Sequence, residues 1–265
     1  MDIDAQFPAL STLAHSHGIT LNDLAKSGRA DEDEYLRLPD CCYMVQKTKH
    51  RWVVDARNYL ATFDEFIRRL PDDYSRKKIW RKVASRNSSE FLDTVVEAAW
   101  ALEFWDNGNT PVLEQRFDPS NRDSKDADIV VVLDGVKHWL DAKNIQLSKT
   151  KFPVATADNP FVQTRSPQDI IRALAAKAKA EYQKKFGAAI QSGFFKNDAL
   201  GILLCVLKSE SQVLIPLVVD VPNSTPPEGL LGNKPGLNKV LIHTLRPHSN
   251  SDVLRPIVVA DWHAV

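Results

Sequence analysis

The sequence has little cysteine, no long apolar run and no net charge, and each shortage excludes a class of protein. Its three cysteines, two of them adjacent, do not suit a disulfide framework, so we expect a reduced, cytoplasmic setting. No apolar run approaches the ~18–20 residues of a membrane span, and the N-terminal MDIDAQFPAL has no signal-peptide pattern. Thirty-four basic residues balance thirty-four acidic ones, so only local basic patches could attract a polyanion.

The motifs of several common enzyme classes are also missing. The chain has no internal repeat, P-loop, Gly-rich dinucleotide-binding turn or GxSxG nucleophile elbow. Its scattered histidines and cysteines have spacings that match no closed tetrahedral zinc site. With 43% hydrophobic and 26% charged residues, the composition is that of a soluble globular protein.

The most informative stretch is residues 126–146, DADIVVVLDGVKHWLDAKNIQ. Two β-branched apolar runs flank Asp134-Gly135, a pair that favours the two-residue type I′ turn of a hairpin. A turn at that point places Asp128 directly opposite Asp141, at a Cβ separation of roughly 4.5–5.5 Å. Because side chains alternate along a strand, Lys143 lies on the same face as Asp141. The spacing therefore predicts two acids and an amine at one place.

Two facing carboxylates repel each other unless a cation neutralises them, and one is otherwise pushed towards protonation. Mg²⁺ or Mn²⁺ removes this conflict, because hard divalent cations prefer carboxylate oxygens. A lysine beside such an ion can hold a water for in-line attack on a phosphodiester, while the metal lowers the pKa of that water. The alternative is a surface hairpin closed by an Asp–Lys–Asp salt bridge.

At these residues the sequence resembles the PD-(D/E)XK nuclease superfamily. The family pattern is an acidic residue, a hairpin and then (Asp/Glu)-x-Lys on the following strand, here Asp128 and Asp141-Ala142-Lys143. Two positions depart from it, since Ala127 stands where proline is usual and Asp141 stands where glutamate is commoner. The resemblance covers roughly residues 88–221, and its strength lies in the order and spacing of short motifs.

The resemblance also assigns roles outside the hairpin. The helix upstream of the hairpin usually contributes a glutamate in this family, and Glu97 matches it best, with Glu90 as the alternative. Gln146, three residues after the lysine, matches a glutamine that some branches carry there. The resemblance thus implies Asp128, Asp141 and Glu97 as ligands of Mg²⁺ or Mn²⁺. Lys143 would orient the nucleophilic water, and Gln146 would position that water or the substrate.

The implied function is a magnesium-dependent deoxyribonuclease, an endonuclease of restriction-like or structure-specific type. Its partner would be DNA, with RNA as an alternative substrate of the same chemistry, and no membrane. Many relatives form homodimers to cut both strands. The rival hypothesis is a nucleic-acid-binding or assembly module on the same fold that does not cleave.

The expected fold is α/β, with a restriction-endonuclease-like core, in which helices flank a mixed central sheet, and a mainly helical N-terminal region. Residues 1–85 would form that helical region, which would bind nucleic acid or a partner protein. Its residues 10–28 have the outline of a helix-turn-helix, and a plain helical hairpin is the alternative. Residues 86–265 would form the nuclease domain.

The periodicity of residues 86–265 predicts the elements around the hairpin. A buried helix starts at Ser88 or Ser89 as N-cap and ends near Asn107, and a second helix starts at residue 166 and ends at Gly187. Strands are expected at residues 111–117, 201–208, 213–221 and 255–260. The lysines of the second helix, Lys185 among them, are expected on its exposed side.

Overall fold

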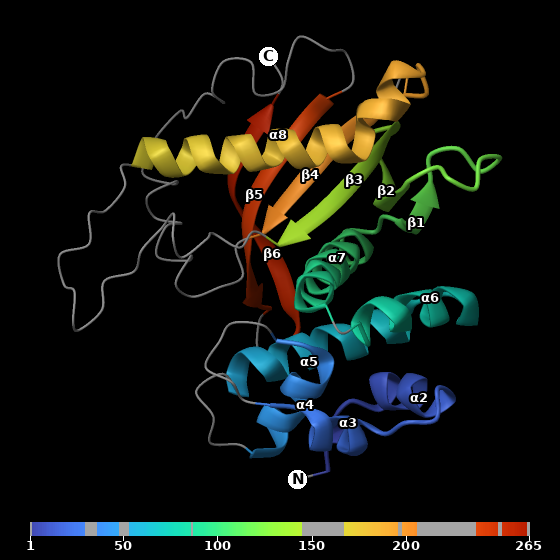
Figure 1. The fold of residues 1–265 in the computed structure, drawn as a ribbon, viewed down its shortest axis with the longest axis vertical. Helices are drawn as coiled ribbons and strands as arrows, with labels where there is room; N and C mark the ends of the chain where they lie inside the picture. Colours follow the sequence, from blue (N-terminus) through green and yellow to red (C-terminus); the bar gives the residue numbers. More distant parts are fainter. Residues whose placement is uncertain are drawn as a thin grey trace. The chain divides into compact units, whose positions relative to one another are not determined.

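The structure, a computed structural model, describes residues 2–29, 36–47, 53–85, 87–144, 167–195, 198–205, 237–248 and 251–263. Within these residues the chain forms eight helices and one open six-stranded mixed sheet, which confirms the predicted α/β class (Figure 1). The chain divides into two compact units, Met1–Gly108 with Leu245–Pro256, and Asn109–Thr244 with Ile257–Val265. This division falls after Gly108, whereas the sequence suggested a boundary after residue 85.

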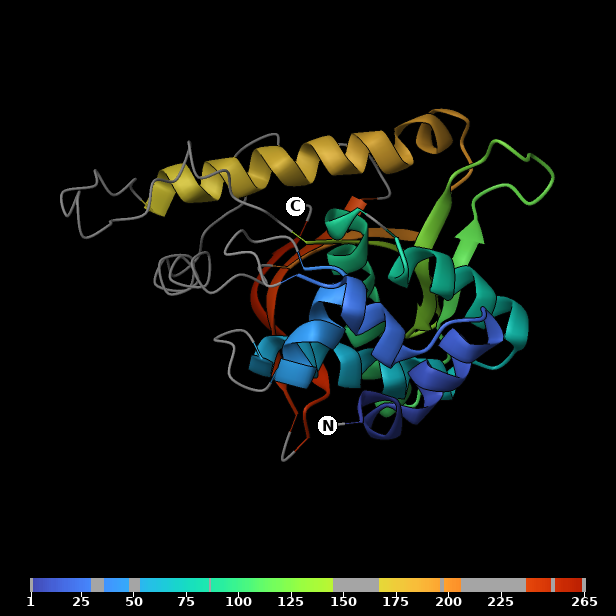
Figure 2. The ribbon, with the colours of Figure 1, turned by 60° about the horizontal axis from the view of Figure 1, so that its bottom comes forward.

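The first unit is built from helices, as expected for the N-terminal part of the chain. They are α1 (Ile3–Gln6), α2 (Pro8–Ser16), α3 (Leu21–Ser27), α4 (Leu38–Lys47), α5 (Val53–Arg69), α6 (Asp73–Val83) and α7 (Ser88–Asp106), which gather in the blue-to-green part of Figure 2. Rings join α5 to α7, because Phe91 lies 5.4 Å from Phe63 and 6.4 Å from Tyr59, centroid to centroid. This packing places α7 in the helical unit.

Helix α7 has nearly the predicted bounds but a different cap. The side chain of Asn87, one residue before the expected cap, accepts a hydrogen bond from the backbone N–H of Ser89. The helix ends as predicted, since Asn107 is its C-cap and Gly108 has a φ of 77°, a conformation that glycine adopts without strain. Its apolar residues are buried around most of its circumference.

Helices α2 and α3 form the helix–turn–helix outline that the sequence suggested. The start of α3 is closed from within the chain, because Asp4 accepts hydrogen bonds from the backbone N–H groups of Leu21 and Asn22. Thr20 caps the same end. A carboxylate at this position repels a phosphate, so the contacts favour the hairpin interpretation over a recognition helix.

The sheet of the second unit has the strand order β1-β2-β3-β4-β5-β6. The strands are β1 (Val112–Arg116), β2 (Asp126–Leu133), β3 (Val136–Asn144), β4 (Ala199–Cys205), β5 (Leu237–Pro247) and β6 (Leu254–His263). Strands β1, β2 and β3 pair antiparallel, and β3, β4 and β5 pair parallel. Helix α8 (Pro167–Gln191) lies between β3 and β4 in the chain and supplies the crossover that a parallel pair needs.

The β2–β3 hairpin has the predicted turn and register. Asp134 and Gly135 have φ values of 49° and 78°, as a type I′ turn requires. Val131 lies opposite His138, and the ladder continues with Ile129 opposite Leu140. The next residues in this register are Asp128 and Asp141, so turn chemistry alone determines which side chains face each other.

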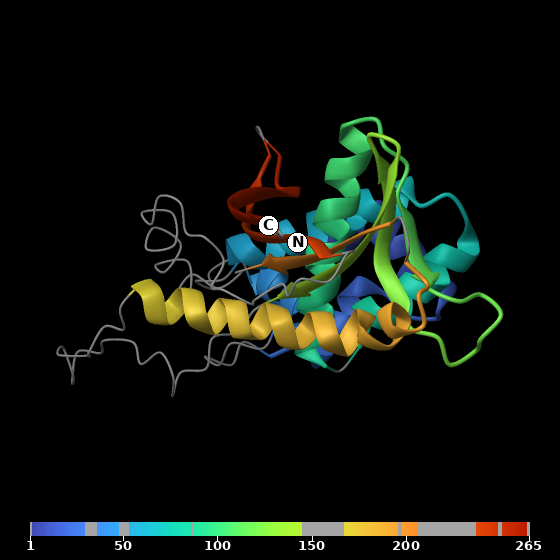
Figure 3. The same ribbon diagram turned by 90° about the horizontal axis from the view of Figure 1, so that it is seen from above.

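Helix α8 crosses one face of the sheet, as Figures 1 and 3 show. It is held there by aromatic rings, since Phe186 lies 5.4 Å from Phe117 and 6.1 Å from Phe195. Trp139 of β3 lies 5.4 Å from the same Phe195, so the rings connect helix and sheet. Trp139 and Asp141 are two residues apart on β3, and α8 therefore covers the face that carries Asp141.

The predicted end of α8 at Gly187 is wrong. The helix continues to Gln191, and the chain turns at Gly193, where φ is 73°. Ala188 and Ala189 follow Gly187 directly, and alanine is the best helix former, which offsets the modest cost of an interior glycine.

The other predicted strands meet different outcomes. Strands expected at residues 111–117, 201–208 and 255–260 correspond to β1, β4 and β6. The strand expected at residues 213–221 lies outside the described residues. Strand β5 was not predicted, because the segment that precedes it is rich in proline and turn residues. In the described part of the chain, no helix is both long and apolar enough to span a bilayer.

His243 on β5 makes the stability of the second unit dependent on pH. The side chain is fully buried, and burial lowers its pKa to about 3 from an ordinary value of 6.5. Below pH 6.5 the imidazole of His243 is therefore protonated in the unfolded chain and stays neutral in the folded chain. The stability associated with neutral His243 is complete above pH 6.5 and is lost as the pH falls towards 3.

We expect urea denaturation to detect this loss. Between pH 6.5 and pH 5 the wild type should lose about 1.6 kcal/mol of unfolding free energy that His243→Gln does not lose. The unfolding free energy of each protein is measured against pH, and the two slopes are compared. The comparison removes the contribution of the titratable groups that both proteins share. Equal slopes would show that His243 is protonated in the folded state.

Candidate metal centre

The predicted meeting of two acids and one amine on the β2–β3 hairpin is confirmed. The ammonium nitrogen of Lys143 lies 3.8 Å from Oδ2 of Asp128 and 3.8 Å from Oδ1 of Asp141. Asp141 is fully buried and Asp128 is 7% exposed, so solvent screens their charges poorly. The alternative of a surface salt bridge is therefore wrong for this hairpin, whose acids belong to the interior.

The backbone holds Asp128 in place. Its Oδ2 accepts a hydrogen bond of 2.9 Å from the N–H of Ala142, the residue between Asp141 and Lys143 on the neighbouring strand. A carboxylate bonded to the main chain cannot turn away when the charges around it change. Asp128 is thus a fixed point of the site.

A second lysine, Lys185 of α8, contacts both acids more closely than Lys143 does. Its ammonium nitrogen lies 2.5 Å from Oδ1 of Asp141 and 3.1 Å from Oδ1 of Asp128. The expectation that Lys185 lies on the exposed side of its helix is wrong, because its side chain is only 18% exposed. Lys185 directly precedes the buried Phe186, at the border of the apolar stripe, and the two carboxylates draw its amine inwards.

The electrostatics of this group are those of buried charge. Burial, together with the charge of Asp128, raises the pKa of Asp141 to about 7, even though both lysines act in the opposite direction. Burial lowers the pKa of Lys185, but the two carboxylates outweigh it and the net pKa is raised. The Lys185 ammonium is therefore strongly held in its charged form.

The Oδ2 atom of Asp141 is a candidate ligand for a metal ion. Among the residues that the structure describes, none donates a hydrogen bond to Oδ2 of this fully buried carboxylate. A buried acceptor without a donor is costly, and a metal ion is one partner that would satisfy it.

Glu114 of β1 adds a carboxylate that the sequence did not predict. The β1–β2 ladder pairs on either side place it opposite Asp128, and carboxylate oxygens of the two residues lie within 4.8 Å of each other. Glu114 has a φ of 53°, which is rare for a residue other than glycine and unusual inside a strand. Strained backbone of this kind is concentrated at functional sites. No turn chemistry connects β1 to β2, so the register that reveals Glu114 was not readable from the sequence.

Within the first unit, Glu97 rather than Glu90 is the buried carboxylate of α7. Glu97 is 1% exposed, and its Oε2 lies 2.6 Å from the ammonium nitrogen of Lys82 on α6. Glu90 is exposed and accepts a hydrogen bond from the hydroxyl of Ser85. Of the two glutamates that the sequence left open, only Glu97 has the buried carboxylate that a metal ligand on this helix requires.

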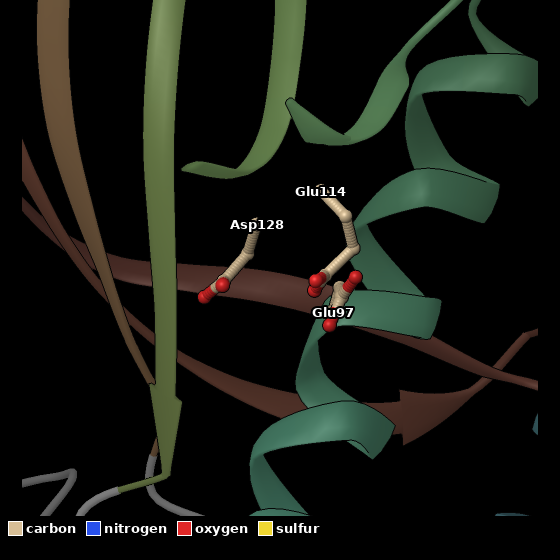
Figure 4. A group of neighbouring side chains, drawn as sticks. All are labelled: Glu97, Glu114 and Asp128. Carbon is tan, nitrogen blue, oxygen red and sulfur yellow. The ribbon is translucent and has the colours of Figure 1, made fainter. Parts of the chain in front are cut away.

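Figure 4 labels the side chains of Glu97, Glu114 and Asp128. Glu97 belongs to the first unit, and Glu114 and Asp128 belong to the second. Oxygen donors of this kind suit Mg²⁺ or Mn²⁺ and do not suit soft metals. Asp128 and Glu114 of the second unit therefore offer the oxygen donors that the predicted ion prefers, and Glu97 stays a predicted ligand. Gln146, the remaining predicted residue, lies outside the described residues.

No protein-family model, curated protein or solved structure matches this chain. The resemblance to PD-(D/E)XK nucleases and the catalytic roles that it implies therefore stay predictions. They depend on the hairpin motif and on the side chains gathered around it.

The backbone of Glu114 provides a test of strain at this site. Glu114→Ala and Glu114→Gly both remove the carboxylate, but only alanine keeps a Cβ atom at φ 53°. We expect the glycine variant to be more stable than the alanine variant by about 1 kcal/mol, measured by urea denaturation without metal. In an ordinary strand glycine is the less stable of the two. An alanine variant as stable as the glycine variant, or more so, would contradict the left-handed conformation.

Proposed function

We propose that this protein is a metal-dependent phosphodiesterase that hydrolyses DNA, acting as an endonuclease. The observation that carries the proposal is the hairpin, which brings the Lys143 ammonium within 3.8 Å of the carboxylates of both Asp128 and Asp141. An Asp-x-Lys pair that faces Asp128 across a hairpin of an α/β sheet is the arrangement expected of a PD-(D/E)XK nuclease. In this proposal the sheet and its helices form the restriction-endonuclease-like core.

In this proposal several carboxylates coordinate the metal ion. Asp128 and Glu114 are the ligands that the second unit supplies, and Asp141 offers the oxygen that accepts no hydrogen bond from described residues. Glu97, the buried glutamate of α7, is the further ligand that the resemblance to the nuclease superfamily predicts. The bound Mg²⁺ or Mn²⁺ would lower the pKa of a water and stabilise charge that develops on the phosphate.

Lys143 has the position of the residue that orients the water. It contacts each acid at 3.8 Å, too long for a tight ion pair, and its side chain is 24% exposed, so its ammonium can reach both the interior and an entering phosphate. An ammonium there would hold a nucleophilic water by hydrogen bonding and oppose the negative charge of the scissile group. Gln146 would assist in positioning the water or the substrate.

A second candidate is a nucleic-acid-binding or assembly module on the same fold that does not cleave. The observation that favours it is Lys185, which with Lys143 provides two ammonium groups for the two acids Asp128 and Asp141. The two ammonium groups balance the formal charge of the two carboxylates without a metal. An RNase with the same site is the third form of the hypothesis, and parallel DNA and RNA substrates distinguish it from a deoxyribonuclease.

A plasmid-nicking assay with Mg²⁺ or Mn²⁺ tests the proposal. We expect the wild type to cut supercoiled DNA, and Asp128→Asn and Lys143→Gln to lose about 10²-fold or more of that activity. The loss is expected because the first variant removes a ligand charge and the second removes the group that holds the water. Circular dichroism of each variant would show that the fold is retained.

Asp134→Asn is the matched control. It makes the same chemical change at the end of the same strand, and Asn-Gly suits a type I′ turn as well as Asp-Gly does. We expect this variant to cut as the wild type does. Nucleic-acid binding that persists in EDTA, with no cleavage under Mg²⁺ or Mn²⁺, would replace the nuclease with the non-cleaving module.

A further inference from the structure

Among the described residues, the cation that lies closest to the two buried acids is Lys185, which the proposed reaction does not use. It lies 2.5 Å from Oδ1 of Asp141 and 3.1 Å from Oδ1 of Asp128, whereas Lys143 lies 3.8 Å from each acid. Asp128 is held by the backbone of Ala142, and Asp141 is fully buried. The ammonium of Lys185 therefore lies where the carboxyl groups of Asp128 and Asp141 converge.

A divalent ion that joined Asp128 and Asp141 would need this same space. Lys185 contacts the Oδ1 atoms of Asp128 and Asp141, and both residues are candidate metal ligands in the proposed function. An ammonium and a divalent cation repel each other strongly at a separation of a few ångströms in a buried site. Binding of the ion is therefore coupled to departure of the Lys185 amine.

The side chain of Lys185 can leave without unfolding its helix. It reaches the acids from α8 on a flexible four-carbon chain, and it remains 18% exposed. Glu181 lies four residues earlier on the same helix and is already paired with Lys177 and Lys184. Side chains four residues apart are neighbours on a helix surface, so Glu181 is a ready acceptor for the displaced amine.

We infer that Lys185 is a built-in counter-ion that occupies the Asp128–Asp141 pair in the metal-free protein and competes with the divalent ion for it. The inference rests on the proposed metal site. It makes Lys185 a residue that lowers metal affinity and stabilises the metal-free fold. A lysine with a purely structural role would stabilise both states, and a catalytic lysine would change activity without changing metal affinity.

Mn²⁺ alone, added to the full chain and followed by electron paramagnetic resonance, measures this competition. We expect Lys185→Gln to bind Mn²⁺ roughly tenfold more tightly than the wild type, because the competing charge is gone. The same variant should melt at a lower temperature without metal. Its melting temperature should rise more than that of the wild type when Mn²⁺ is added.

Lys184→Gln is the matched control. This neighbour on the same helix has a side chain 75% exposed and pairs with Glu181 instead of the buried acids. We expect its Mn²⁺ affinity to equal that of the wild type. Lys185→Arg, which keeps the charge, should not tighten Mn²⁺ binding.

A second pair of variants tests the inference if Lys185→Gln does not fold. Asp141→Asn removes one acid, and Asp141→Asn with Lys185→Gln then removes one charge of each sign and leaves no excess negative charge. We expect the double variant to bind Mn²⁺ more tightly than Asp141→Asn alone, through Asp128. Unchanged or weaker binding on removal of Lys185, in either background, would overturn the inference.

The result of the Mn²⁺-binding test can be distinguished from the result of the test of the nuclease proposal. Tighter Mn²⁺ binding by Lys185→Gln with no plasmid cleavage by any protein would support the counter-ion and reject the nuclease. Cleavage by the wild type, with Mn²⁺ affinity unaffected by Lys185→Gln, would support the nuclease and reject the counter-ion.

Discussion

The second unit depends on the burial of two like charges at one point. Asp128 and Asp141 are almost completely removed from solvent, and a pair of buried carboxylates is tolerated only when cations or metal ions compensate them. Lys143 from the hairpin and Lys185 from α8 provide that compensation. The raised pKa of Asp141 shows that it is incomplete, because burial and repulsion together outweigh both lysines. Strongly perturbed pKa values of this kind are concentrated at functional sites.

The surrounding fold keeps the charges in place. The type I′ turn at Asp134-Gly135 sets the hairpin register, and the backbone of Ala142 holds the Asp128 carboxylate. Ring contacts between Phe186 and the sheet hold α8 against the face that carries Asp141. The aromatic packing thus determines how far the amine of Lys185 reaches, and the apolar core and the charged group depend on each other.

Some of the site was readable from the sequence because it depends on local rules. A two-residue turn determines every opposed pair in its hairpin, so the facing of Asp128 and Asp141 and the phase of Lys143 followed from counting. The resemblance to the nuclease superfamily pointed to Glu97 and left Glu90 open, because both lie on a helix whose circumference is mostly apolar. These predictions needed no knowledge of what packs against the hairpin.

The contacts between elements that long loops connect could not be predicted from the sequence. Glu114 faces Asp128 only because β1 pairs with β2 in a register that no tight turn determines, and its left-handed φ is not encoded in its residue type. The sequence suggested that Lys185 is exposed like the other lysines of its helix. Helical periodicity places the residue at the edge of the apolar face but does not predict the direction in which its ammonium group points. The sequence by itself determined the hairpin with its two acids and one lysine, since turn geometry and alternation are local. Only the tertiary structure decided which further charges surround them, since those positions follow from the packing of α8 and β1 on the finished sheet.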